Sequence, residues 1–203
     1  MDTVKLRRVF SSLPVLETER LVLRRIAQEN AYDMFAYASL SDVTRYLLWS
    51  PHINIDETRG YIEFLQQRYR RGEYGDWGLN CKADGRFIGT VGFADLMFAH
   101  NKGELGYVLN PEYQGKGYMR EALGAVMELA FMTLDLHRLE LRIMENVASE
   151  RLAEAAFRYE GRRAIAARQG GLPHHPPLRA FEKRLSFRPA ISDKKRYGRI
   201  PWE

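Results

Sequence analysis

The stretch from Glu104 to Glu121 combines a short apolar run, a turn with two glycines and the start of an amphipathic segment. The run at 104–109 has the pattern of a strand, and the Asn-Pro pair after it starts a turn. Apolar residues at helical spacing follow Gly115 and Gly117. A helix that begins after small residues presents unpaired backbone N–H groups and the positive end of its dipole. Since glycines lack the side chains that would keep an anion from these amides, the stretch predicts a diphosphate-binding loop.

The spacing excludes two common phosphate-binding motifs. A P-loop requires G-x-x-x-x-G-K-[ST], whereas here Lys116-Gly117 is followed by Tyr118. A dinucleotide fingerprint requires G-x-G-x-x-G, whereas Gly115-Lys116-Gly117 is followed by Tyr118, Met119 and Arg120. The pattern that fits residues 114–119 is Q-x-x-G-x-(G/A), with Met119 in the last small position.

This pattern resembles the acetyl-CoA signature of the GNAT acyltransferase superfamily. The surrounding sequence GYVLNPEYQGKGYMREAL, and the lead-in at Leu16–Leu21, are similar to the branch that contains the ribosomal-protein N-terminal acetyltransferases. The resemblance covers about residues 16–161. It implies an α/β fold of the GNAT type, a three-layer arrangement in which helices flank a mixed central sheet.

The resemblance also implies a coenzyme site. The loop and first helical turn would hold the pyrophosphate of acetyl-CoA through residues Gln114, Gly115, Lys116, Gly117, Tyr118, Met119 and Arg120. In the family, the strand before this loop, here near Val108 and Leu109, parts from its neighbour and pairs with the pantetheine chain. Asn146 of the Asn-x-x-Ser pattern would anchor the pantetheine or cap a helix.

Two residues are the catalytic candidates. Glu104 shares a strand face with Gly106 and Val108, and relatives place a glutamate at this end of the strand as the general base. The alternative is a surface glutamate paired with Lys102 or Arg142. Ser149 occupies the position that some relatives use to protonate the leaving thiolate, and the alternative is a helix N-cap.

Periodicity and turn signals predict the remaining elements. Strands are expected at 19–26, 75–82, 86–96, 138–143 and 157–160, and helices at 30–39, 54–72, 116–133 and 146–156. The Asp84-Gly85 pair predicts a hairpin and hence a partly antiparallel sheet. Residues 1–14 are predicted to form a loose arm. The closing strand that the resemblance implies is not recognisable after Gly161, and residues 181–187 are the candidate replacement.

Composition places the chain among globular proteins. Its 203 residues are 45% hydrophobic and 28% charged, with a single cysteine and no apolar run long enough for a membrane helix. A cytoplasmic protein without disulfides is expected, with Cys81 buried in a strand. No metal site is predicted, because His174-His175 has no partner ligand at metal spacing. His137 is expected to be packed or hydrogen-bonded. An aromatic group, Tyr46, Trp49, Tyr61, Phe64 and Trp77, favours core packing over the acceptor side.

Composition changes near Gly161. Residues 161–203 hold eleven Lys or Arg against three acidic residues, and five of the eight prolines. The predicted division is an N-terminal arm at 1–15, a GNAT domain at 16–161 and a basic, Pro-containing segment at 162–203. This segment could contact RNA or the ribosome surface, or form a solvated end.

The sequence therefore predicts an acetyl-CoA-dependent N-acetyltransferase that acts by direct attack of a neutral amine, with a protein N-terminus as the favoured acceptor. The alternatives are a small-molecule or antibiotic amine as the acceptor, an acyl-CoA-binding module without turnover, and a nucleic-acid-binding protein driven by its tail. The oligomeric state stays open between monomer and homodimer.

Overall fold

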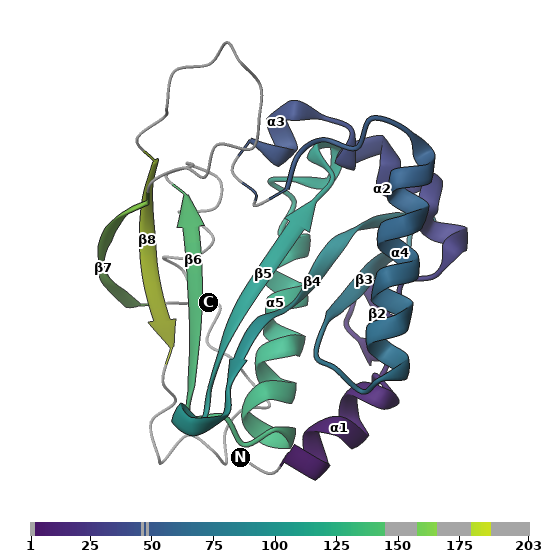
Figure 1. Cartoon of the computed structure of the whole chain (residues 1–203). Helices are drawn as coiled ribbons and strands as arrows, with labels where there is room; N and C mark the ends of the chain where they lie inside the picture. Colours follow the sequence, from purple (N-terminus) through teal and green to yellow (C-terminus); the bar gives the residue numbers. More distant parts are fainter. Residues whose placement is uncertain (1–2, 46, 48, 145–157, 166–179, 188–203) are drawn as a thin grey trace.

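The computed structural model describes residues 3–45, 47, 49–144, 158–165 and 180–187. Within them, one sheet has the strand order β1-β2-β3-β4-β5-β6-β8-β7 (Figure 1). The strands are β1 (Leu16–Glu17), β2 (Leu21–Arg24), β3 (Asp76–Cys81), β4 (Phe87–Met97), β5 (Lys102–Leu109), β6 (Arg138–Met144), β7 (Arg158–Ile165) and β8 (Ala180–Phe187). The helices are α1 (Thr3–Ser11), α2 (Ala31–Ala38), α3 (Ser41–Thr44), α4 (Ile55–Arg70) and α5 (Tyr118–Glu128), and α5 continues as one π-helical turn over Leu129–Thr133.

The sheet is mixed, as predicted. Neighbouring strands pair antiparallel except β5 and β6, which are parallel. The predicted hairpin joins β3 to β4 through Gly85, whose φ of +72° lies in the left-handed region that glycine favours. The apolar residues Leu139, Leu141 and Ile143 of β6 are buried as predicted, while of the charged residues between them Glu140 is buried as well and Arg142 is exposed.

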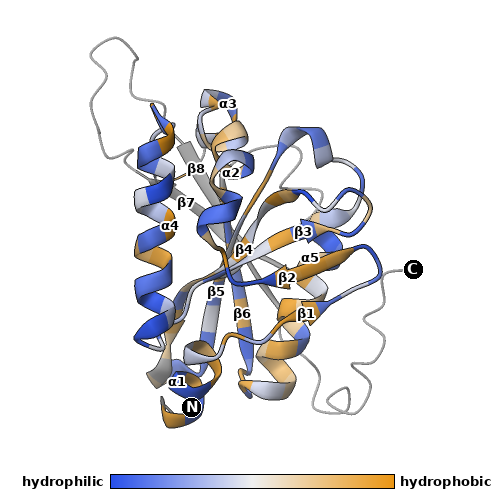
Figure 2. Ribbon diagram, turned by 90° about the vertical axis from the view of Figure 1, so that its right-hand side faces the viewer, coloured by the Kyte–Doolittle hydropathy of each residue, from blue (hydrophilic) through white to orange (hydrophobic). Residues whose placement is uncertain are grey.

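Helices cover both faces of the sheet. α2 and α4 lie on one face and α5 on the other, so the sheet is the middle of three layers (Figures 1 and 2). The apolar stripe of α4 buries Ile62, Leu65 and Tyr69. The stripe of α5 buries Met119, Ala122, Leu123, Val126 and Met127. The three-layer α/β arrangement expected from the sequence is therefore the observed one.

Local signals explain where the helices begin. Asn54 caps α4, because its Oδ1 accepts hydrogen bonds from the N–H groups of Asp56 and Glu57, both at 3.0 Å. Asn30 stands at the start of α2 without a side-chain capping bond to it, because its Oδ1 accepts a hydrogen bond from the N–H of Ala27 at 3.0 Å and closes the 3₁₀ turn at Gln28–Asn30. α5 begins at Tyr118, two residues after the predicted start.

The expected boundary at Gly161 does not separate the C-terminal strands from the sheet. β7 runs through Gly161 to Ile165, and β8 pairs antiparallel with both β6 and β7. Residues 181–187 thus supply a closing strand, as the sequence suggested. The helix predicted at 146–156 and residues 188–203 lie outside the described residues. Among the described residues, every helix is too short or too polar to cross a bilayer.

The expectation of a loose N-terminal arm is wrong. Residues Thr3–Ser11 form α1, and Leu6, Phe10 and Leu13 are buried in the main core. The ring of Phe10 lies 6.2 Å from that of Trp77 and 5.9 Å from that of Phe93, measured between centroids. The apolar residues Leu6 and Phe10, spaced at i and i+4, turn one face of the helix to the core.

Truncating Phe10 tests this packing. Phe10→Ala should lower the free energy of unfolding by about 3–5 kcal/mol, because a fully buried ring is replaced by a cavity. Val4→Ala is the matched control, since Val4 is 75% exposed on the same helix. Urea unfolding followed by circular dichroism measures both, and equal midpoints for the two variants would show that α1 does not contribute to the core.

Candidate active site

Strands β5 and β6 part in the middle of the sheet. Their parallel register runs from Lys102 with Arg138 to Leu105 with Leu141, and β5 continues to Leu109 while β6 continues to Met144. The rest of β5 pairs with β4 and the rest of β6 with β8. Figure 1 shows the two strands diverging toward the end of the sheet where α5 begins.

The antiparallel alternation decides which backbone groups of β5 face this gap. The N–H of Asn110 donates to the carbonyl oxygen of Ile88 on the β4 side, at 2.8 Å. Because the direction alternates along a strand, the backbone groups of Val108 also point to β4. Those of Tyr107 and Leu109 point to the side of β6. An extended ligand chain in the gap would meet main-chain groups of these two residues.

The loop after β5 leads the chain to the N-terminus of α5. Gly115 and Gly117 have φ values of +73° and +82°, a region that residues with a Cβ rarely adopt. A Cβ at Gly115 would meet no atom within 4 Å, so this position is open. The first turn of α5 then presents N–H groups that lack intrahelical partners, which is the feature that binds anions. The predicted strand, glycine turn and helix are all present.

Side chains of the loop brace it against the rest of the fold. Gln114 Nε2 donates to the carbonyl oxygen of Leu109 at 3.0 Å, and Lys116 Nζ donates to that of Glu112 at 2.7 Å. The hydroxyl of Tyr113 donates to Asp84 Oδ2 at 2.5 Å and ties the loop to the β3–β4 hairpin. Gln114 and Lys116 therefore use their side chains within the loop, which leaves their backbone as the predicted contact with a ligand.

The remaining loop candidates have separate surroundings. Met119 is 5% exposed, so its side chain belongs to the core. Tyr118 packs partly against the core, and its hydroxyl accepts a hydrogen bond from the thiol of Cys81 at 3.8 Å. Arg120 lies in the first turn of α5 and is partly buried. The expected burial of Cys81 is confirmed.

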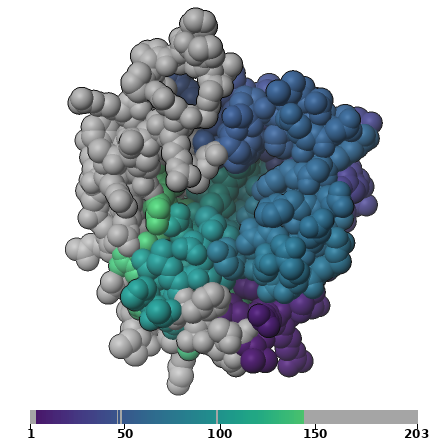
Figure 3. All heavy atoms as spheres, viewed as in Figure 1, coloured from purple at the N-terminus to yellow at the C-terminus, as the bar shows by residue number. Residues whose placement is uncertain are grey.

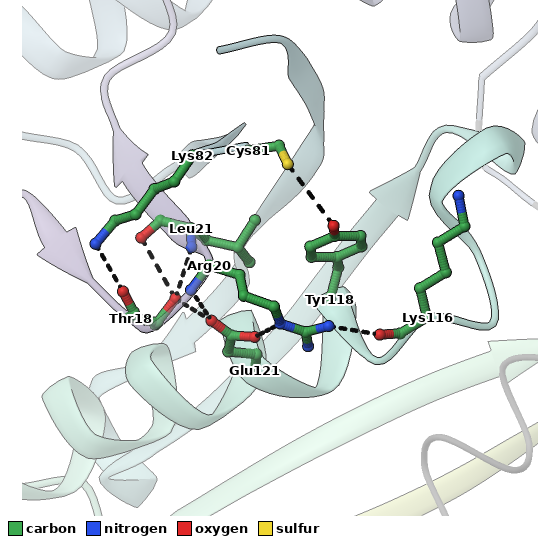
Figure 4. Close-up of polar contacts among 8 residues, drawn as sticks. All are labelled: Thr18, Arg20, Leu21, Cys81, Lys82, Lys116, Tyr118 and Glu121. Carbon is green, nitrogen blue, oxygen red and sulfur yellow. Dashed lines mark hydrogen bonds and ion pairs between the residues drawn. The ribbon is translucent and has the colours of Figure 1, made fainter. Parts of the chain in front are cut away.

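A polar cluster around Arg20 and Glu121, which was not predicted from the sequence, braces the loop and the start of α5 (Figure 4). Arg20, just before β2, forms an ion pair with Glu121 of α5, with 2.7 Å between Nε and Oε2. The other oxygen of Glu121 accepts from the Thr18 hydroxyl at 2.5 Å and from the Arg20 N–H at 2.7 Å. Burial raises the pKa of Glu121, but the hydrogen bonds from Thr18 and Arg20 outweigh it and hold the pKa below its ordinary value. The lead-in at Leu16–Leu21 was the signal for this cluster in the sequence.

Glu104 lies beside the point where β5 and β6 part. Its carboxylate forms an ion pair with Arg142 of β6, with 2.8 Å between Oε2 and Nη2, and its side chain is 14% exposed. In the sheet, Glu104 lies opposite Asp95 on β4 and opposite Glu140 on β6. Glu140 is 1% exposed and is neutralised by Lys102 at 2.9 Å and Arg138 at 2.8 Å. Of the two predicted surface partners of Glu104, the structure selects Arg142.

The face of the sheet that carries Glu104 continues toward α4. Figure 3 shows the molecular surface hollowed between α4 and β5. Phe64 and Tyr61 of α4 are 49% and 36% exposed there, so the expectation of core packing is wrong for these two. It is right for Trp77, which is fully buried, while Tyr46 lies outside the described residues. Trp49, His52, Tyr61 and Phe64 form a continuous row of ring contacts.

Two acidic residues on this face were not predicted from the sequence. Asp76 starts β3, and its carboxylate accepts a hydrogen bond from the Tyr61 hydroxyl at 3.5 Å. Burial raises the pKa of Asp76 to about 6, although the positive charge of Arg68 and the Tyr61 hydroxyl both lower it. Asp95 of β4 accepts from the Tyr74 hydroxyl at 3.3 Å. A partly buried carboxylate with a raised pKa is the kind of group found in functional sites.

The other candidates are placed as follows. Asn146 and Ser149 lie outside the described residues, as does His174-His175. His137 Nδ1 is hydrogen-bonded to the carbonyl oxygen of Asn101 at 2.8 Å, as expected. The described part of the chain contains no group of three or more His, Cys, Asp or Glu side chains that could hold a metal ion.

Comparisons with known proteins agree with this geometry. Residues 20–156 match the family model described as the acetyltransferase (GNAT) domain. The chain is 32% identical over 163 residues to the uncharacterized N-acetyltransferase YoaA of Bacillus subtilis (strain 168), covering 79% of this chain and 92% of that relative. It is 26% identical over 156 residues to the ribosomal protein uS5-alanine N-acetyltransferase of Escherichia coli (strain K12), covering 72% of this chain and 79% of that relative.

Among solved structures, the fold is similar to RimL, the ribosomal L7/L12 alpha-N-protein acetyltransferase in complex with coenzyme A. The TM-score is 0.72 at 18% sequence identity, with 86% of this chain and 98% of that chain covered. The parting of β5 and β6, the glycine turn before α5 and the match over residues 20–156 lead to one conclusion. The chain belongs to the GNAT family and is an N-acetyltransferase.

Proposed function

We propose that this enzyme transfers the acetyl group of acetyl-CoA to a primary amine, with the α-amine of a protein N-terminus as the favoured acceptor. The observation that supports the proposal most directly is that the gap between β5 and β6 lies next to the glycine turn. The gap between β5 and β6 opens at the end of the sheet where the glycine turn and the N-terminus of α5 lie. An extended pantetheine chain and a diphosphate would occupy these neighbouring places together.

The coenzyme would be held mainly by backbone groups. The N–H groups of Gly115 to Arg120 would donate to the pyrophosphate, supported by the helix dipole. The pantetheine would lie along β5 and exchange hydrogen bonds with Tyr107 and Leu109. This arrangement brings the thioester toward the point where the strands part, next to Glu104.

The reaction then requires no covalent enzyme intermediate. The lone pair of the neutral amine attacks the thioester carbonyl carbon, a C–N bond forms and the C–S bond breaks. Glu104 would accept the proton that the amine nitrogen loses, with Arg142 orienting its carboxylate. Ser149 is proposed to protonate the departing thiolate.

Proton affinity favours an α-amine as the acceptor. An α-amino group has a pKa near 8, whereas a lysine amine has a pKa of about 10.4. At neutral pH about a tenth of the α-amine is already uncharged, so one carboxylate is a sufficient base. The similarity to the uS5-alanine N-acetyltransferase over 72% of this chain supports the same choice.

A cationic small molecule is the second candidate acceptor. The face that carries Glu104 also has Asp76 and Asp95, and the exposed rings of Tyr61 and Phe64 border it. Carboxylates and aromatic faces both attract ammonium groups. A small amine with more than one positive charge would use this surface, whereas a peptide would engage it mainly through its N-terminus.

A panel of acceptors decides between these functions. The wild-type chain is incubated with acetyl-CoA and either peptides with free N-termini, matched peptides with a blocked N-terminus and an internal lysine, or polyamines. Released thiol measures turnover, and mass spectrometry locates the acetyl group. The proposal expects acetylation of the free N-terminus. Turnover with polyamines alone would favour the second candidate, and stabilisation by coenzyme A without thiol release would indicate a binding module.

Glu104→Gln tests the proposed base. We expect kcat to fall by about a hundredfold, with the largest loss at acidic pH, where more of the amine is protonated and a base is most needed. The control is Glu29→Gln, which also breaks one ion pair, since Glu29 Oε1 lies 3.0 Å from Arg24 Nη2. Rate profiles from pH 6 to 9 measure both variants. An unchanged profile for Glu104→Gln would remove this residue from the mechanism.

Asp76→Asn tests whether burial of the charged Asp76 carboxylate lowers the stability of the fold. An unfolded Asp has a pKa of about 3.9, so between about pH 4 and 6 the folded protein holds a proton that the unfolded chain has lost. Stability therefore falls as the pH rises through this window, and the full cost is present above it. The neutral amide should stabilise the fold at pH 7.5 by about 2 kcal/mol and lose most of this advantage at pH 4.

Urea unfolding at pH 4, 5 and 7.5 measures the effect. Asp42→Asn is the control, because Asp42 is an exposed carboxylate. The interpretation fails if the difference between Asp76→Asn and the wild type stays constant with pH.

A further inference from the structure

Arg20 contacts both sides of the glycine that precedes α5 (Figure 4). Its Nη1 donates to the carbonyl oxygen of Lys116 at 2.8 Å, and its Nε pairs with Glu121 at 2.7 Å. Its guanidinium carbon lies 4.5 Å from the centroid of the Tyr118 ring. Its Nη2 lies only 3.3 Å from where a Cβ of Gly117 would be. One side chain from the start of β2 thus holds three successive residues, 116–118, and the first turn of the helix.

The hydrogen bond to Lys116 fixes the direction of the next N–H group. A trans peptide unit is planar, so the carbonyl of Lys116 and the N–H of Gly117 point in opposite directions. With the carbonyl held toward Arg20, the N–H of Gly117 points away from it, to the opposite side of the loop. A carbonyl that accepts from a cation is also polarised, which makes the N–H of the same peptide unit a stronger donor.

We infer that Arg20 is a positioning residue for coenzyme binding, which acts through the Lys116–Gly117 peptide and does not touch the phosphates. This inference rests on the proposed binding of the pyrophosphate at the loop. Arg20 is suited to the role because its planar guanidinium bonds two acceptors in a fixed geometry. Glu121 completes the arrangement, since it binds both the side chain and the backbone N–H of Arg20.

The charge of Arg20 also matters at this position. Gly117 has a left-handed φ of +82°, and because glycine has no Cβ it can also adopt other conformations. A cation on the carbonyl side favours the peptide orientation that turns donors outward toward an anion. Without it, the loop could rotate this peptide and lose one donor from the diphosphate site.

Binding measurements on the full chain test this role. The variants are Arg20→Ala, Arg20→Lys, Glu121→Gln and the control Arg24→Ala. Arg24 is matched because it lies four residues further on, at the end of β2, forms one ion pair and has a side chain that is 42% exposed, against 41% for Arg20. The ligands are coenzyme A and 3′-dephospho-coenzyme A, which share the diphosphate and differ in the ribose phosphate. Isothermal titration calorimetry gives the affinities, and thermal unfolding without ligand reports stability.

Arg20→Ala should weaken the binding of both ligands by about tenfold, equivalent to about 1.4 kcal/mol. Arg20→Lys and Glu121→Gln should show smaller losses of the same kind, because each keeps the positive charge but loses part of the fixed geometry. Arg24→Ala should bind both ligands like the wild type. These two milder variants keep the test decisive if Arg20→Ala does not fold.

Three results would overturn the inference. A loss for coenzyme A but not for the dephospho form would show that Arg20 binds the ribose phosphate directly. Losses in the Arg20 variants no greater than in Arg24→Ala would show only a structural ion pair. If the wild type bound neither ligand, the proposed coenzyme site would fail as well, which separates that outcome from the other two.

Discussion

The parting of two parallel strands in the middle of the sheet is the constraint on which the site depends. From Gly106 to Leu109, β5 has β4 on one side, while its other side faces the gap left by β6. An extended ligand chain could lie along this side of β5, in the place that an added strand would take. The neighbouring glycine turn and helix N-terminus then place donors at the end of the same gap.

The two faces of the sheet differ in polarity. The face against α5 is apolar, because Leu105, Leu139 and Leu141 alternate with charged neighbours. The charged residues of the same strands therefore gather on the other face, toward α4. Glu104, Asp95 and Glu140 lie side by side across three strands, which would be unfavourable for like charges alone. Arg142, Arg138 and Lys102 offset this repulsion, and they leave a polar surface next to the point where β5 and β6 part, the proposed place of the thioester.

The loop proposed to bind the coenzyme is stabilised by residues from distant parts of the sequence. Tyr113 connects it to Asp84 in the β3–β4 hairpin, and Arg20 connects it to the start of β2. Such contacts hold backbone donors in place before a ligand arrives, which reduces the entropy lost on binding. Glycine provides the left-handed conformations that the turn needs, and these neighbouring side chains limit the freedom that glycine would otherwise have.

Residues close together in the chain were enough to predict the strand, glycine turn and helix from Glu104 to Glu121, the β3–β4 hairpin and the apolar alternation of β6. They also determined the family, since the signature is local. The sequence did not predict that α1 packs into the core, that β8 lies between β6 and β7, or that Glu104 pairs with Arg142 rather than with Lys102. The tertiary structure likewise revealed Arg20 and Asp76, whose roles arise from residues far away in sequence. All of these features escaped prediction for the same physical reason. Burial and pairing across the sheet depend on distances in space, which a linear sequence pattern does not contain.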